Sequence, residues 1–178
     1  HLICVPTDHG HDPSPAALED VLPHVCEVIE HNARSVRSGE SEPPILIIES
    51  TIVPSWLDEI VLPEIARHGL AVGRDVHVGA APRRDWFSGE EYTLRTLPRV
   101  VGGTSPEATD LIAAFYSLIC YTIRPAKDAR HAALTKVVEN ALRYQRISFA
   151  KALAVGLPRY DTAHVLELAA TKWNIPYY

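Results

Sequence analysis

The sequence lacks the features that would bind nucleic acid or cross a membrane. Its 22 Asp and Glu outnumber its 17 Lys and Arg, and the formal net charge is −5. A chain with this balance has no basic surface for a phosphate backbone. The longest apolar run, around residues 45–48, is far shorter than the roughly 20 residues that span a bilayer. We therefore predict neither nucleic acid nor membrane as a partner.

Cysteine is also scarce. Cys4, Cys26 and Cys120 are far apart, odd in number and surrounded by apolar residues. This pattern does not predict a disulfide framework. We interpret the three residues as reduced thiols in the core of a cytoplasmic protein.

Several well-known catalytic and cofactor motifs are missing. No G-x-S-x-G elbow is present, and Gly102-Gly103 lacks the spacing of a dinucleotide fingerprint. The segment His9-Gly10-His11-Asp12 has potential metal ligands, but no second set of ligands accompanies it. Because zinc and similar ions need a full ligand set, we predict no metal site.

The composition that remains is that of a globular α/β protein. Hydrophobic residues make up 47% of the 178 residues and charged residues 22%. Short apolar runs alternate with helical patterns, which is typical of a parallel sheet covered by helices. Ser105 and Asp161 stand where helix N-caps are expected, and Gly69 stands where a C-cap is expected. The predicted strands cover residues 2–7, 45–51, 76–82, 98–103 and 120–125, and the predicted helices cover residues 16–37, 56–68, 106–118, 128–155 and 162–171.

The longest predicted helix divides the chain into two regions. Residues 128–155 contain no Pro or Gly and predict a helix of about 40 Å at 1.5 Å per residue. We expect a sheet domain over residues 1–125 and an all-helical region over residues 126–178. The chain opens directly on an apolar strand and stops without a terminating helix, so we expect it to be the middle of a larger protein.

Polar residues follow four of the predicted strands. The ends of these strands, residues 5–7, 49–51, 81–84 and 102–104, combine short polar residues with small ones. Ligands of open parallel sheets bind beyond the carboxyl ends of the strands, so these residues predict one shared crevice. The alternative is that strand ends are polar only because they meet loops.

Lys136 and Asn140 form a second candidate. They are four residues apart in an otherwise apolar helical segment, so they share one face of the helix. The residues alone leave two interpretations open, an active-site pair or the exposed side of a packed helix.

Five segments in this order resemble the UDP-glucose/GDP-mannose dehydrogenase family, the nucleotide-sugar 6-dehydrogenases. The resemblance covers residue 2 to about residue 175, and it is carried by the segments ICVPT, ILIIESTIVPS, VHVGAAPRRDW, LPRVVGG and KVVENALRYQRIS. It implies the C-terminal half of a Rossmann-like NAD-binding domain with a parallel sheet. A long central helix and the start of an all-α dimerisation domain would follow.

The resemblance also implies a reaction. Family members use NAD to oxidise the C6 alcohol of a nucleotide sugar to a carboxylate. Two hydride transfers pass through a thioester on a catalytic Cys, and the long helix forms a homodimer. We expect a UDP- or dTDP-hexose of the glucose type as substrate. The product would serve polysaccharide or antibiotic biosynthesis.

The family's site residues map onto matching positions. Thr7 and Thr51 resemble the threonines near the nicotinamide half of NAD, and Thr51 also matches the residue associated with a catalytic water. Lys136 and Asn140 match the pair beside the reacting C6 oxygen. The resemblance implies catalytic roles for Thr51, Lys136 and Asn140, cofactor binding by Val5, Pro6, Thr7, Glu49, Ser50 and Thr51, and substrate binding by Arg83, Arg84, Lys136 and Asn140.

The departures from the family pattern are specific. The family usually has Ser-Pro-Glu after the third strand, with a catalytic Glu, whereas this sequence has Arg83 there. Lys151 replaces a further family Asn. The glycine fingerprint and the nucleophilic Cys have no match among these residues, so we expect the 178 residues alone not to reduce NAD.

Two alternatives remain open at this point. One is a degenerate homologue that acts as a dimerising or regulatory partner, for which Arg83 is the main argument. The other is an enzyme related to 6-phosphogluconate or hydroxyacid dehydrogenases, which share the arrangement of a helix after a Rossmann domain.

Overall fold

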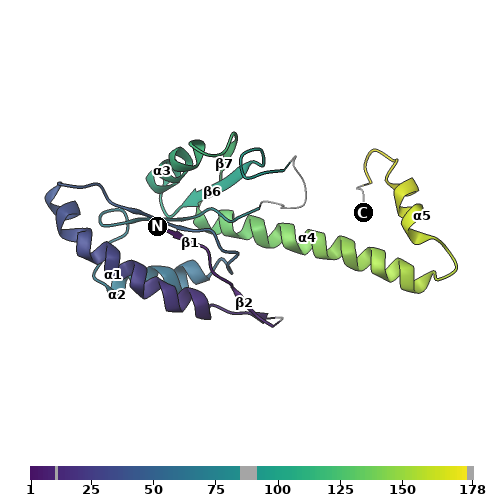
Figure 1. Cartoon of the computed structure of the whole chain (residues 1–178), viewed down its shortest axis with the longest axis horizontal. Coiled ribbons are helices and arrows are strands. Elements are labelled where there is room, and N and C mark those ends of the chain that lie inside the picture. Colours follow the sequence, from purple (N-terminus) through teal and green to yellow (C-terminus); the bar gives the residue numbers. More distant parts are fainter. Residues whose placement is uncertain (11, 85–91, 176–178) are drawn as a thin grey trace. The chain divides into compact units, whose positions relative to one another are not determined.

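The centre of the fold is a five-stranded sheet (Figure 1). The computed structural model describes residues 1–10, 12–84 and 92–175. The strand order is β1-β4-β5-β6-β7. These strands are β1 (Leu2–Ile3), β4 (Ile45–Ile48), β5 (His77–Ala80), β6 (Arg99–Gly103) and β7 (Ile123–Pro125). All five predicted strands are thus present, although each is shorter than its apolar run.

The sheet is mainly parallel, as predicted, and it contains one antiparallel strand pair. β1, β4 and β5 are mutually parallel, and β6 is parallel to β7. β6 is antiparallel to β5, with Gly79 opposite Gly103 and Ala80 opposite Gly102. A parallel crossover needs a long connection, usually a helix. The sequence of residues 81–98 has no helical periodicity, which fits an antiparallel return.

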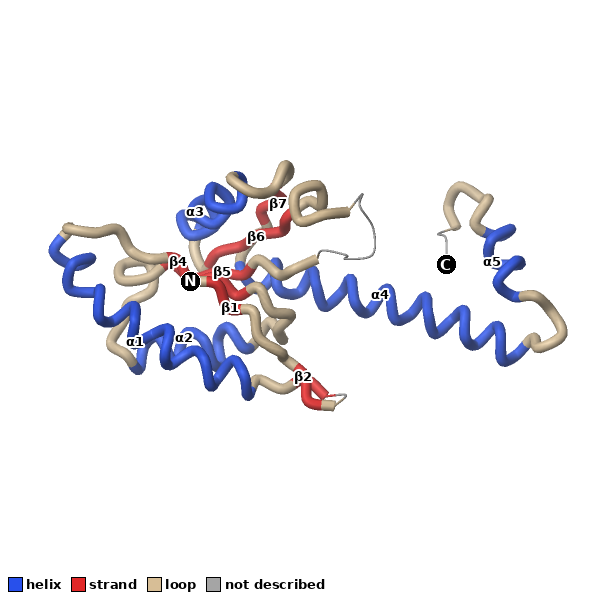
Figure 2. Tube along the Cα trace, in the orientation of Figure 1, coloured by secondary structure: helices blue, strands red, loops and turns tan. Residues whose placement is uncertain are grey.

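Helices cover both faces of this sheet (Figures 1 and 2). Because strand side chains alternate between faces, Leu46 and Ile48 contribute to one buried cluster and Ile47 to the other. The first cluster includes residues of α1 (Ala16–Ser38), η1 (Leu57–Val61) and α2 (Leu62–Arg67). The second includes Ile112 and Tyr116 of α3 (Pro106–Ser117).

The predicted helix over residues 56–68 is divided into a π-helical turn and an α-helix. The π-helical η1 spans Leu57–Val61, and the α-helix α2 follows directly. Pro63 has no backbone N–H and therefore cannot donate to the carbonyl of Glu59 four residues earlier. Loss of this bond accounts for the wider turn at this point.

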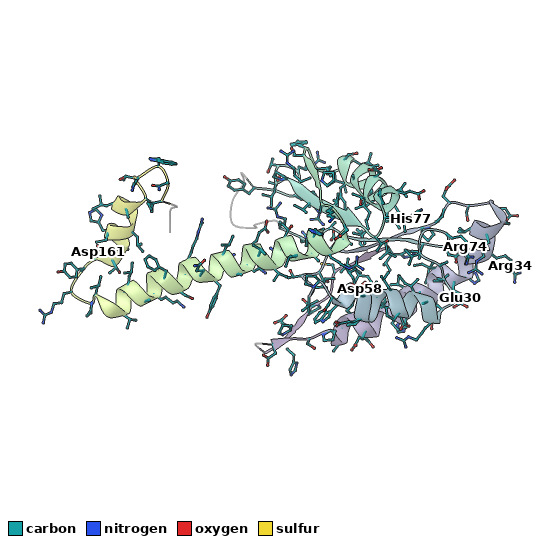
Figure 3. All side chains as sticks on the ribbon, turned by 180° about the vertical axis from the view of Figure 1, so that it is seen from behind. Glu30, Arg34, Asp58, Arg74, His77 and Asp161 are labelled. Atoms are coloured by element: carbon teal, nitrogen blue, oxygen red, sulfur yellow. The ribbon has the colours of Figure 1, made fainter. Side chains whose placement is uncertain are left out.

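The predicted helix caps are confirmed. The Ser105 side chain accepts a hydrogen bond from Ala108 N, and that of Asp161 accepts one from His164 N (Figure 3). Gly69 follows the end of α2 with a φ of 66°, the left-handed region that favours glycine.

A small hairpin precedes α1. β2 (Asp8–His9) and β3 (Asp12–Pro13) pair antiparallel and lie apart from the main sheet (Figure 2). No strand was predicted in this polar stretch. His11 lies outside the described residues. Among the described residues, no group of three potential ligands could hold a metal ion.

The long predicted helix is α4 (Ala129–Gly156), and α5 (Thr162–Ala169) follows it. The chain divides into two compact units, residues 1–137 and residues 138–178, and α4 begins in the first and continues into the second. No helix in the described part of the chain is long and apolar enough to cross a membrane. The predicted division into a sheet domain over residues 1–125 and a helical region over residues 126–178 stays a prediction.

The prediction of three core thiols is correct for two of them. Cys26 and Cys120 are buried, but Cys4 is exposed. Cys4 directly follows the edge strand β1, in which Ile3 points into the core. Successive side chains of an extended segment point to opposite sides, so Cys4 points away from that core.

Candidate functional site

The carboxyl ends of β1 and β4 lie side by side and are joined by hydroxyl groups. The Ser50 hydroxyl accepts a hydrogen bond from Val5 N at 2.7 Å and donates to the Val5 carbonyl at 2.9 Å. The Thr7 hydroxyl donates to the Thr51 carbonyl oxygen at 2.5 Å. The structure therefore brings together the two predicted cofactor-binding segments, residues 5–7 and 49–51.

The hydroxyl groups at this edge have different tasks. Ser50 is buried and engaged at both donor and acceptor positions, so its observed role is to join the two strands. Thr51 is half-buried, and its hydroxyl makes no hydrogen bond to the residues that the structure describes. Of these two side chains, Thr51 is the one with a polar group available to a ligand.

The end of β5 joins the same edge. Ala81 N donates to the Ile48 carbonyl at 2.9 Å, and Arg83 N donates to the Glu49 carbonyl at 3.0 Å. Arg83 is exposed, whereas the Arg84 guanidinium donates to the Pro98 carbonyl at 2.8 Å and anchors that segment. Asp85 and Trp86, which complete the matching sequence segment, lie outside the described residues.

The fourth predicted segment, residues 102–104, lies elsewhere, and its inclusion in the crevice is wrong. Because β6 runs antiparallel to β5, Thr104 lies at the amino end of β5, where its N–H donates to the Val78 carbonyl. A Cβ atom on Gly103 would come within 2.4 Å of Thr109 N, and one on Gly102 within 2.2 Å of the Asp128 carbonyl oxygen. These two glycines allow close packing of chain segments rather than the approach of a ligand.

Arg99, at the start of β6, lies at this edge of the sheet instead of residues 102–104. The sequence-based prediction missed it. Its guanidinium forms an ion pair with Glu49 and donates to the Ala81 carbonyl at 2.6 Å and to the Tyr116 hydroxyl at 3.2 Å. It also lies over the Tyr116 ring, 4.5 Å from the centroid. The one feature of the sequence that pointed to Arg99 was the presence of a charged residue within the apolar run LPRVVGG.

Tyr116 completes this group. Its hydroxyl donates to the same Glu49 oxygen that accepts from Arg99. Burial, and then the hydrogen bond to Glu49, raise the pKa of Tyr116 far above its usual range, so the phenol keeps its proton and acts as a donor. The Glu49 carboxylate is thus held from two sides, and its predicted role in cofactor binding remains a prediction.

The first turn of α4 is anchored to the sheet unit. Asp128 accepts from His131 N at 2.9 Å, and Arg130 forms an ion pair with Asp58 of η1 (Figure 3). Ala132 and its neighbours are buried in the core that also contains the sheet residues. The start of α4 is therefore fixed by an N-cap, an ion pair and apolar packing.

Lys136 and Asn140 continue the face of α4 that begins with Ala129 and Ala132. The spacing of four to Ala132 and seven to Ala129 places Lys136 on this face, and Asn140 follows one turn later. Lys136 is half-buried and forms no ion pair within the described residues, while Asn140 is exposed and belongs to the second unit. Their catalytic roles remain predictions.

Comparison with known proteins identifies several nucleotide-sugar dehydrogenases. No family model matches the chain. The chain is 29% identical over 177 residues to the UDP-N-acetyl-D-glucosamine 6-dehydrogenase of Pseudomonas aeruginosa, a match that covers 97% of this chain and 40% of that protein. The chain is a relative of the nucleotide-sugar dehydrogenases.

Two further matches cover most of this chain. Protein CapL of Staphylococcus aureus is 31% identical over 134 residues, which are 73% of this chain and 32% of CapL. The structure of the UDP-D-ManNAc dehydrogenase of Pyrococcus horikoshii matches 99% of this chain and 40% of its own, with a TM-score of 0.82 at 26% identity. The chain therefore spans at most two fifths of the length of these three proteins. The α/β fold of the resemblance is confirmed.

Proposed function

We propose that this chain is part of an NAD-dependent nucleotide-sugar 6-dehydrogenase that oxidises the C6 alcohol of a UDP- or dTDP-hexose to the uronic acid. The observation that carries the proposal is the Thr7–Thr51 hydrogen bond, which joins the carboxyl ends of β1 and β4. Dinucleotides bind open sheets at such an edge. The relatives' names, which describe nucleotide-sugar dehydrogenases, support the same reaction class.

The residues at this edge fit NAD. The half-buried Thr51 hydroxyl offers a donor and acceptor, and the extended Val5-Pro6-Thr7 segment provides an apolar wall beside it. When bound, NAD accepts the hydride that leaves the sugar carbon. In this proposal residues 5–7 and 49–51 orient the nicotinamide half, and Thr51 also holds the water that attacks in the second half of the reaction.

Lys136 and Asn140 supply electrostatic stabilisation in this proposal. Loss of hydride from an alcohol and attack of water on a thioester both develop negative charge on oxygen. An ammonium and an amide N–H at that oxygen lower the barrier by about 3 kcal/mol or more. Mounting both on one helix is favourable because small misplacements reduce the rate steeply.

Arg83 has a binding role in this proposal. A guanidinium stays protonated and cannot act as a general base, so it does not replace the family's Glu. It is well suited to an anionic diphosphate. Arg84 is assigned to the same task, although its guanidinium also anchors the Pro98 carbonyl.

The thioester requires a Cys outside these 178 residues. None of Cys4, Cys26 and Cys120 matches the nucleophilic Cys of the family that the sequence resembles. Cys26 and Cys120 are moreover buried, and burial raises the pKa of the Cys26 thiol to about 11, which leaves it unreactive. We infer that the full-length protein supplies this Cys, so that each sugar yields two NADH.

We infer that the protein is a cytoplasmic homodimer that forms through α4. Apolar residues of this helix are exposed in the single chain, which favours burial against a second copy. They include Leu134, Val137, Val138, Leu142 and Ile147. In light-scattering measurements, Leu142→Asp should shift the full-length protein to monomers, and an unchanged mass would contradict this interface.

The sugar is tested by a substrate panel with the full-length protein. UDP-glucose and dTDP-glucose test the glucose-type substrate. The N-acetylated sugars in the relatives' names favour a second candidate, a UDP-N-acetylhexosamine. The proposal predicts absorbance from NADH with one of these sugars and two NADH per sugar consumed. A single NADH per sugar would contradict the carboxylate product.

The alternatives predict other results. A hydroxyacid-type enzyme would reduce NAD with a small hydroxy acid but with no nucleotide sugar. A degenerate partner would reduce NAD with neither, and Arg83→Glu would then raise the rate strongly. In our proposal Arg83→Glu instead weakens nucleotide-sugar binding, because a carboxylate repels the diphosphate.

A further inference from the structure

We propose that Arg99 is the positioning residue of this site, holding the ends of β4 and β5 in place and neutralising Glu49 where anionic nucleotides bind. The inference rests on the proposed function, because it assigns Arg99 a part in binding NAD and the nucleotide sugar. Arg99 is not a catalytic residue in this account, since it acts through other residues.

One guanidinium connects three separate parts of the chain. The Arg99 side chain is 3% exposed and contacts Glu49 after β4, Ala81 after β5, and Tyr116 of α3. Glu49 directly precedes Ser50 and Thr51, and Ala81 lies two residues before Arg83. Two of the chain segments that carry proposed ligand contacts, residues 49–51 and 81–84, are therefore held by Arg99.

The antiparallel direction of β6 makes this arrangement possible. In a wholly parallel sheet, Arg99 would lie at the amino edge of the strands, at the end opposite to Glu49. Because β6 is reversed, its first residue lies at the carboxyl edge of β5. β6, which runs antiparallel to β5, thus supplies the buried guanidinium of Arg99.

The chemistry of the contacts requires arginine in particular. A planar guanidinium presents several donors in a fixed fork and stacks on an aromatic ring, whereas an ammonium is a single compact charge. The Arg99 nitrogen Nη2 donates to Glu49, Ala81 and Tyr116, and the guanidinium lies over the Tyr116 ring. Replacement by Lys keeps the charge but loses the planar group over the ring.

A buried ion pair is costly to form and is weak evidence for stability alone. Here it has an electrostatic consequence. NAD and a nucleotide sugar both carry a negatively charged diphosphate. Without Arg99, the Glu49 carboxylate would be an unpaired anion beside the segment that holds Thr51, and it would repel both ligands.

Four variants of the full-length protein test the inference. They are Arg99→Gln, Glu49→Gln, the double variant Arg99→Gln/Glu49→Gln, and Arg95→Gln as a matched control at an exposed arginine. Affinity for NADH is measured by fluorescence, together with KM and kcat. Backbone hydrogen exchange over residues 49–53 and 81–84 and the melting temperature are measured without ligand.

Arg99→Gln should weaken NADH binding at least about tenfold, since it leaves one charge of a buried pair without its partner. Backbone hydrogen exchange should become faster in residues 49–53 and 81–84. The double variant should regain most of the affinity, because it also removes the unpaired carboxylate. Arg95→Gln should match the wild type in all measurements. If Arg99→Gln does not fold, Arg99→Lys replaces it, with a smaller loss in the same direction.

Two results would overturn the inference while leaving the proposed function intact. One is a wild-type affinity for NADH in Arg99→Gln with only a lower melting temperature, which indicates a structural role. The other is a double variant that binds no better than Arg99→Gln. A wild type that neither binds NADH nor oxidises a nucleotide sugar would instead contradict the proposed function itself.

Discussion

Asp75 gives the sharpest prediction about stability. Its carboxylate is fully buried and accepts two hydrogen bonds from Arg37, two from Arg74 and one from Ala71 N, at 2.7–3.1 Å. Arg37 lies in the last turn of α1, and Asp75 lies just before β5. Asp75 therefore ties the end of α1 to the segment that enters the sheet.

The expected cost of Asp75→Asn follows from these contacts. The amide keeps one acceptor oxygen but loses the charge and turns an NH₂ group toward two guanidinium groups. Hydrogen bonds to charged groups contribute about 1.5–3 kcal/mol each. The two arginines are 45% and 62% exposed, so water replaces part of what they lose. We expect a net loss of about 2–4 kcal/mol, which overlaps the lower part of the range of about 3–5 kcal/mol for breaking a buried pair.

Thermal unfolding measures this loss. A change of this size lowers the melting temperature by roughly 5–12 °C in a protein of 150–250 residues. Asp110→Asn, at an exposed position of α3, is the matched control and should leave the melting temperature unchanged. If Asp75→Asn also behaves like the control, the Asp75 contacts do not stabilise the fold.

The remaining predictions concern pH, packing and thiol reactivity. Hydrogen bonds from Arg37 and Arg74 hold the pKa of Asp75 well below its usual range, so the contribution of Asp75 to folding stability is complete above the usual Asp pKa and is lost as the pH falls below about 4. The difference in melting temperature between wild type and Asp75→Asn should therefore shrink in acid. A difference that stays constant with pH would refute this prediction. Gly103→Ala should lower the free energy of unfolding by about 1–3 kcal/mol, because its Cβ would overlap backbone atoms of Ala108 and Thr109. Gly156→Ala has open space around it and should be neutral or stabilising. Equal effects of the two substitutions would show that close packing at Gly103 does not determine stability. In this chain a thiol reagent should label Cys4 rapidly and should label Cys26 and Cys120 only on unfolding, which mass spectrometry of labelled peptides would verify or contradict.

The sequence predicted the elements of the fold because their signals are local. Ser105, Asp161 and Gly69 mark helix ends through chemistry that involves only their nearest neighbours. The strands are recognisable as apolar runs such as ILII. The direction of β6 is not local information, because an apolar run reads the same whichever way the strand pairs.

Only part of the candidate site was predictable from the sequence. Residues 5–7 and 49–51 follow parallel strands, so their meeting at one edge follows from the topology. The inclusion of residues 102–104 failed because it assumed the wrong direction for β6, and Arg99 was missed for the same reason. A buried cation that pairs with a residue 50 positions away leaves no periodic pattern in the sequence.

We propose that Lys136 and Asn140 are the oxyanion-stabilising groups of a nucleotide-sugar dehydrogenase, and a substitution of Lys136 tests this proposal. The measurement is NADH formation by the full-length protein with its best nucleotide sugar, in the wild type, in Lys136→Met and in Lys127→Met, which alters an exposed lysine. The account predicts a loss in kcat of roughly 10²–10³-fold for Lys136→Met and no change for Lys127→Met. Equal rates in Lys136→Met and the wild type would contradict it.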